Sequence, residues 1–98
     1  MKPYISNDEA VIRKIREDPE FAAEYLKAAL EDTEEPRVLL IALRHLAQAR
    51  GMARVAKRAG IERESLYRVL SPGGNPRFST LMAVIRALGL SITVQTAA

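Results

Sequence analysis

This chain of 98 residues contains no cysteine and no tryptophan, only five aromatic residues and a single histidine. Without cysteine there is no disulfide framework and no thiolate metal site, and a reducing cytoplasm is the expected compartment. Because His45 has no second histidine near it in the sequence, we expect it to be a structural residue and expect no metal. The scarcity of aromatic residues makes a protein that stacks the bases of single strands less attractive.

Long hydrophobic stretches and recognisable catalytic motifs are also missing. No apolar run approaches the length of a membrane span, and the N-terminal residues lack the core of a signal peptide. The Gly73-Gly74 pair has neither the preceding strand nor the lysine of a phosphate-binding loop. With one histidine and no cysteine, neither an enzyme nor a cofactor is expected. What remains is one small soluble domain, residues 1–98, of ordinary hydrophobic and charged content.

Charge is divided unevenly along the chain. Residues 1–35 contain five basic and ten acidic side chains, a net charge of −5, whereas residues 36–98 contain ten basic and two acidic side chains, a net charge of +8. A polyanion such as nucleic acid is therefore expected to meet the second part, and the acidic first part is free for another partner. The alternative is that these charges only contact solvent.

Helix start signals predict two helices in the acidic part. Ser6 or Asn7 is placed to cap a first helix of about residues 8–17. Asp18 followed by Pro19 then starts a second helix, since aspartate is a good cap and proline is favoured at the first helical position.

Similar signals divide the basic part into helices. Pro36 opens a helix that Gly51 ends, and a loop rich in proline and glycine covers residues 71–77. A last helix follows this loop, with Ser79 as its expected cap and Gly89 as its stop. The alternating residues after Gly89 predict a short C-terminal strand, which has no partner in the chain and could pair with a second copy or stay unpaired.

The segment from Met52 to Ser71 carries the most specific pattern. Counted from Met52, the fifth position is Ala56, where a larger side chain would push two helices apart, and the ninth is Gly60, where the turn between them needs a positive φ. The core-facing positions of two steeply packed helices hold apolar residues, namely Val55, Ala59, Ile61, Leu66 and Val69. This pattern is typical of a DNA-binding helix-turn-helix, residues 52–71, and favours a DNA-binding regulator.

The second helix of this motif is predicted to read DNA bases. Its N-terminal end enters the major groove most deeply, and there Arg63 can grip guanine while Glu64 can accept a hydrogen bond from cytosine. The predicted base-contacting residues are Arg63, Glu64, Tyr67 and Arg68. The alternative is that Glu64 and Arg68 form a pair four residues apart that has no role in DNA binding.

Other side chains in and beside the motif are predicted to contact phosphates. Such contacts give affinity without sequence information. The predicted phosphate contacts are Arg54, Lys57, Arg58, Ser65 and Arg77. Any one of these cations alone is as consistent with an ordinary solvated side chain as with a DNA contact. As a set around one motif, they are expected to form a footprint for DNA.

These residues resemble a known family, the addiction-module antidote proteins, a branch of the lambda-repressor-like (Cro/repressor type) helix-turn-helix proteins. The stretches that carry the resemblance are YLKAAL at Tyr25–Leu30, ALRHLAQARGM at Ala42–Met52, VAKRAGIERESLYRVLSPGGNPRFSTL at Val55–Leu81 and ALGL at Ala87–Leu90. The expected fold is therefore an all-α helix-turn-helix bundle of this type, with extra N-terminal helices and a short C-terminal strand.

The resemblance implies an antitoxin of a type II toxin–antitoxin pair. Such a protein would bind operator DNA as a homodimer and repress the promoter that it shares with a small toxin similar to the RelE, ParE and HigB group. It would also neutralise that toxin by direct contact. Two alternatives stay open: a stand-alone transcriptional regulator without a toxin, and a protein-interaction module that no longer binds DNA.

The acidic helices of residues 1–35 are the expected contact for the toxin. Toxins of this group act on RNA, so the resemblance implies a basic surface that an acidic one would attract. The expected toxin-binding residues are Glu20, Glu24 and Glu31. These helices could instead serve only to complete the core.

Overall fold

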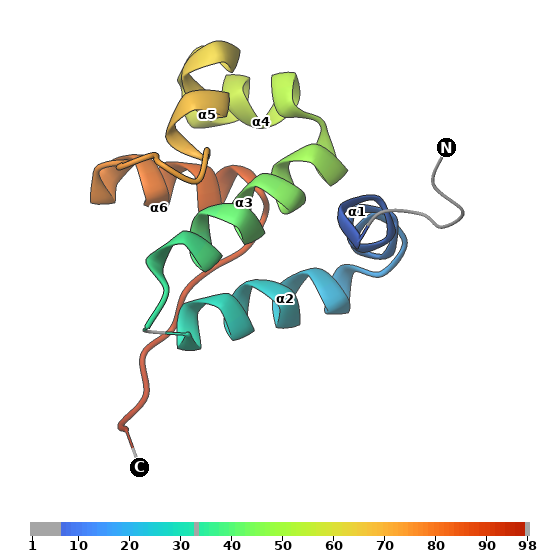
Figure 1. Ribbon diagram of the computed structural model, residues 1–98, viewed down its shortest axis with the longest axis vertical. Helices are drawn as coiled ribbons and strands as arrows, with labels where there is room; N and C mark the ends of the chain where they lie inside the picture. The colour runs from blue at the N-terminus through green and yellow to red at the C-terminus, as the bar shows by residue number, and fades with distance from the viewer. Residues whose placement is uncertain (1–6, 33, 98) are drawn as a thin grey trace.

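The computed structural model describes residues 7–32 and 34–97, and within them the chain forms six α-helices (Figure 1). In chain order these are α1 (Asn7–Glu17), α2 (Pro19–Glu31), α3 (Pro36–Arg50), α4 (Met52–Ala59), α5 (Arg63–Val69) and α6 (Phe78–Ala87). The predicted helices are all present. In this described part of the chain, no helix is long and apolar enough to cross a membrane.

The predicted start of α2 is confirmed by its hydrogen bonds. Asp18 has an extended backbone, and its carboxylate accepts hydrogen bonds of 3.1 and 3.3 Å from two backbone N–H groups of the first turn. Pro19 occupies the first helical position, where its missing N–H costs no intrahelical hydrogen bond. Helix α1 begins at Asn7, and Ser6, the other residue considered as its cap, lies outside the described residues.

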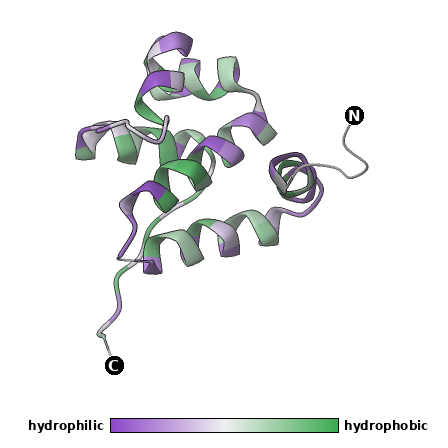
Figure 2. Cartoon of the chain, viewed as in Figure 1, coloured by the Kyte–Doolittle hydropathy of each residue, from purple (hydrophilic) through white to green (hydrophobic). Residues whose placement is uncertain are grey.

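Helix α3 occupies the middle of the molecule, with α1 and α2 on one side and the remaining helices toward the other (Figure 1). It contacts α1, α2 and α4, and α4 in turn contacts α5 and α6. Residues from all six helices form one core, namely Ile15, Leu26, Leu43, Val55, Leu66 and Ile85 with their neighbours. Figure 2 shows hydrophobic and hydrophilic residues alternating along α2 and α3, as expected of helices that each bury one side.

Helix α6 begins before the predicted cap. Arg77 has an extended backbone and is the N-cap residue, and its carbonyl accepts a 3.0 Å hydrogen bond from the N–H of Leu81. A serine caps a helix only where its own backbone is extended, and here the backbone is already helical at Phe78. Ser79 therefore lies inside the first turn, and the prediction that it caps α6 is wrong.

The C-terminal segment, residues 90–97, is not a strand, so this part of the predicted fold is wrong. A strand forms only when its backbone N–H and C=O groups pair with a neighbouring strand. All regular secondary structure in the described residues is helical, so no neighbouring strand is present there. The segment leaves the bundle as extended backbone (Figure 1), with Val94 95% exposed. The alternating sequence alone is therefore not sufficient to form a strand here.

Candidate nucleic-acid interface

Helices α4 and α5 are joined by a tight turn at Gly60. This residue has a left-handed backbone, with a φ of 76°, and its N–H donates to the carbonyls of Ala56 and Lys57. The N–H of Ile61 donates to the carbonyl of Ala56 at 3.0 Å, which closes the end of α4 as in a Schellman motif. The predicted glycine turn is confirmed, because this backbone conformation strains any residue that has a side chain.

The two helices of the motif bury the side chains that the pattern requires. Val55 and Ala56 of α4 are 1% and 2% exposed, and Leu66 of α5 is fully buried. The remaining apolar positions of the pattern are half-buried, namely Ala59, Ile61 and Val69. Leu70, which directly follows α5, is also buried. Helix α5 is thereby fixed on one side, and its other side faces solvent.

Three of the four residues predicted to contact bases are exposed on α5. These are Arg63, Glu64 and Arg68, whereas Tyr67 is half-buried. Two guanidinium groups lie near the Tyr67 ring, that of Arg63 at 5.5 Å from its centroid and that of Arg44 in α3 at 5.8 Å. Guanidinium groups at this distance are attracted to the ring. Sequence reasoning missed Arg44, because its contact with α5 depends on how α3 and α5 pack.

Glu64 and Arg68 do not form the ion pair that their spacing permits. Within residues 7–32 and 34–97, Glu64 has no ion-pair partner, and Arg68 donates a 3.2 Å hydrogen bond to the Ser65 hydroxyl. The alternative in which Glu64 and Arg68 only neutralise each other is therefore wrong. The Glu64 carboxylate and most of the Arg68 guanidinium donors face solvent, where a ligand can reach them.

The loop between α5 and α6 is held against the end of α5. The Ser71 hydroxyl donates a 2.8 Å hydrogen bond to the carbonyl of Arg68, and the N–H of Gly74 donates to the carbonyl of Ser71 at 2.8 Å. A methyl group at Gly74 would collide with the backbone carbonyl of Val69, so only glycine allows this approach. The loop thereby sets the position from which Arg77 starts α6.

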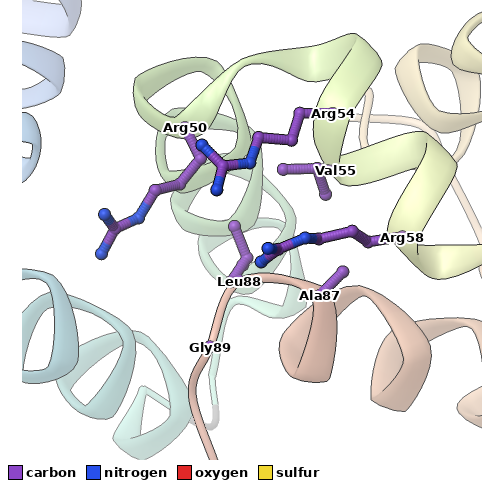
Figure 3. A pocket seen from close by; sticks show the side chains of 7 residues that line it. All are labelled: Arg50, Arg54, Val55, Arg58, Ala87, Leu88 and Gly89. Atoms are coloured by element: carbon purple, nitrogen blue, oxygen red, sulfur yellow. The ribbon is translucent and has the colours of Figure 1, made fainter.

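The residues predicted to contact phosphates come from three elements, α4 (Arg54, Lys57 and Arg58), α5 (Ser65) and the N-cap of α6 (Arg77). Lys57 is exposed on α4, and Arg77 is exposed at the start of α6. Arg54 and Arg58, one turn apart on α4, instead line a cavity of about 250 Å³ with Arg50, the last residue of α3 (Figure 3). No residue of α5 lines this cavity. Sequence reasoning missed Arg50, because Gly51 separates α3 from α4 and only the packing of the two helices brings Arg50 to the same cavity as Arg54.

The acidic residues expected to bind a toxin lie along α2. Glu20, Glu24 and Glu31 are all exposed. Their spacings of four and seven residues return to nearly the same direction on a helix, so the three carboxylates follow one side of α2. We call these three residues the α2 acidic stripe.

His45 is only 7% exposed and joins three helices. Its Nε2 atom is 3.0 Å from a carboxylate oxygen of Asp8 in α1, and its Nδ1 atom is 2.6 Å from the hydroxyl of Tyr25 in α2. An ionised carboxylate can only accept, so Nε2 donates to Asp8, and in the neutral ring Nδ1 accepts from the Tyr25 hydroxyl. Burial, with a further contribution from the Asp8 carboxylate, raises the pKa of Tyr25 above its ordinary value. These hydrogen bonds fit the structural role expected of His45.

Comparison with known proteins matches most of the chain to one family. Residues 8–96 match the family described as "Probable addiction module antidote protein". The chain belongs to this family. An uncharacterized protein of Haemophilus influenzae is 45% identical to it over 71 residues, which are 72% of each chain. No solved structure matches the chain.

Membership of the antidote family indicates an antitoxin role and implies a toxin as a partner. Antidote proteins are in general not enzymes. In the part of the chain that the structure describes, no group of histidine, aspartate and glutamate side chains is arranged to hold a metal ion.

Proposed function

We propose that this antidote protein binds operator DNA through α5 and represses its own promoter. The observation that carries the proposal is the exposed start of α5, where Arg63 and Glu64 lie on a helix-turn-helix with a correctly formed turn and core. Arg63 donates two hydrogen bonds to O6 and N7 of a guanine, and Glu64 accepts one from N4 of a cytosine. Tyr67 and Arg68 contact bases one turn further along α5.

The same proposal gives the neighbouring residues a positioning role on the DNA. Lys57, Ser65 and Arg77 contact phosphates on either side of the groove that α5 enters. One short helix-turn-helix makes few base contacts, so we propose that two copies bind a palindrome as a homodimer. Their half-sites are then centred about 34–36 Å apart, one turn of the DNA helix.

We also propose that the toxin partner binds the α2 acidic stripe. Support comes from the net charge of −5 in residues 1–35 and from the exposure of all three carboxylates. A basic toxin of the RelE, ParE and HigB group would be attracted to this surface, and its association rate would fall with salt. Because the stripe is on α2 and the base-contacting residues are on α5, one molecule offers different surfaces to the two partners.

The DNA-binding proposal is tested with Arg63→Ala and the DNA that flanks the gene. Footprinting should show two half-sites, and the variant should lose about 1–3 kcal/mol of specific binding and tolerate other bases at one position of each half-site. Arg13→Ala is the matched control, because Arg13 is an exposed arginine on α1. If Arg63→Ala binds with the same affinity and base preference as the unmodified protein, the assignment of α5 as the reading helix is wrong.

A further inference from the structure

Three arginines line one cavity that no residue of α5 lines. Arg50 comes from the end of α3, Arg54 and Arg58 come from α4, and the C-terminal end of α6 lines the same cavity (Figure 3). The cavity has a volume of about 250 Å³. Its other walls are apolar or backbone, from Val55, Ala87, Leu88 and Gly89.

The positive charges of this cavity are not balanced by the protein. No acidic residue lines it, and among the described residues none of the three arginines takes part in an ion pair. Arg54 and Arg58 are four residues apart on α4, and like charges at this spacing destabilise a helix. An anion bound in the cavity would reduce this repulsion.

The arginines are not needed to close the end of α6. The carbonyls of Val84, Ile85 and Arg86 already accept hydrogen bonds from the backbone N–H groups that follow the helix. These N–H donors belong to Leu88, Gly89 and Leu90. In the described part of the chain, Arg50, Arg54 and Arg58 donate no hydrogen bond to α6, so capping of this helix does not use their guanidinium donors.

We propose that Arg50, Arg54 and Arg58 form a receptor for a phosphate group carrying more than one negative charge. A carboxylate has a single negative charge, which would leave two of the three positive charges unbalanced. A phosphate monoester or diphosphate carries about two or more charges and three or more terminal oxygens, which suit the forked donors of arginine. The cavity is below the 300–1,000 Å³ of drug-sized ligand sites, and so suits the phosphate end of a ligand.

The probe for this site is inorganic pyrophosphate, titrated into the full-length protein at constant ionic strength. We expect saturable binding by calorimetry, and a dissociation constant raised about tenfold or more in each of Arg50→Gln, Arg54→Gln and Arg58→Gln. Arg86→Gln is the matched control, since Arg86 is exposed on α6 and does not line the cavity. Citrate, a carboxylate of similar charge, should bind more weakly.

Four results would overturn the proposal: no saturable binding of pyrophosphate, an equal loss in Arg86→Gln, equal affinity for citrate, or loss of operator affinity in the three variants. A phosphate of the DNA backbone is a diester with a single negative charge, so the proposed site is not a DNA contact and operator binding by Arg50→Gln, Arg54→Gln and Arg58→Gln should be unchanged. If each variant instead weakens binding to all sequences and lowers the salt slope by about one, the arginines contact DNA and the proposal is wrong. Failure of the unmodified protein to bind operator would reject the proposed function without altering the pyrophosphate result.

Discussion

Replacing His45 by alanine is expected to lower the free energy of unfolding by about 3 kcal/mol. Removal of the buried ring leaves a cavity, which costs about 2 kcal/mol, and the Tyr25 hydroxyl loses its partner, which costs about 1 kcal/mol. The free energy of unfolding of a domain of this size is about 5–15 kcal/mol, so the variant should remain folded at room temperature. Each kcal/mol lowers the melting temperature of such a domain by about 4–8 °C, so we expect a decrease of about 12–24 °C.

Two matched variants separate the contributions to this loss. Tyr25→Phe removes the hydroxyl and keeps the ring, so it should cost about 1 kcal/mol. Asp8→Asn should change stability by less than about 0.5 kcal/mol, because the Asp8 side chain is 74% exposed and the amide oxygen still accepts from Nε2. Urea and thermal unfolding followed by circular dichroism give all three values. A loss below about 1 kcal/mol for His45→Ala, or equal losses for His45→Ala and Asp8→Asn, would refute the reasoning.

Three further predictions concern the loop after α5, alkaline stability and the acidic surface. Gly74→Ala should lower the free energy of unfolding by more than about 1 kcal/mol, because its methyl group collides with the Val69 carbonyl. Gly73→Ala is the control and should not have this effect, because its methyl group meets no atom. Equal losses for the two variants in urea unfolding would contradict this prediction. Because the pKa of Tyr25 is raised in the folded protein, its neutral hydroxyl contributes to the free energy of unfolding. This contribution is complete below the ordinary pKa of tyrosine and is lost as the pH rises through the pKa of Tyr25 in the folded protein. Above a pH of about 10, the free energy of unfolding should therefore fall more steeply with pH for the unmodified protein than for Tyr25→Phe. Equal slopes for the two proteins would contradict this prediction. Reversing the α2 acidic stripe to lysine should abolish binding of the proposed toxin partner and leave operator affinity unchanged. The matched control reverses three acidic residues outside the stripe, Glu17, Glu34 and Glu35. Equal toxin affinity in the two triple variants would place the interface elsewhere, and no complex with the unmodified protein would favour a stand-alone regulator.

Local signals in the sequence were sufficient for most of the fold. Asp18 and Pro19 start α2, and Gly51 and Gly60 separate the helices around the motif, because each acts within one turn of backbone. The buried faces of α4 and α5 also followed from spacing alone, since a helix returns to the same direction every three or four residues. The unequal division of charge is a property of the sequence itself.

Tertiary structure decided the features that join residues distant in the sequence. His45 forms hydrogen bonds with Asp8 and Tyr25 only because α1, α2 and α3 pack against one another. The cavity lined by Arg50 likewise exists only because the end of α6 lines it too. The absence of a strand in residues 90–97 has the same origin. Alternation expresses a preference of the side chains, but a strand exists only when a second strand supplies its hydrogen bonds, and no spacing within one segment can provide that partner.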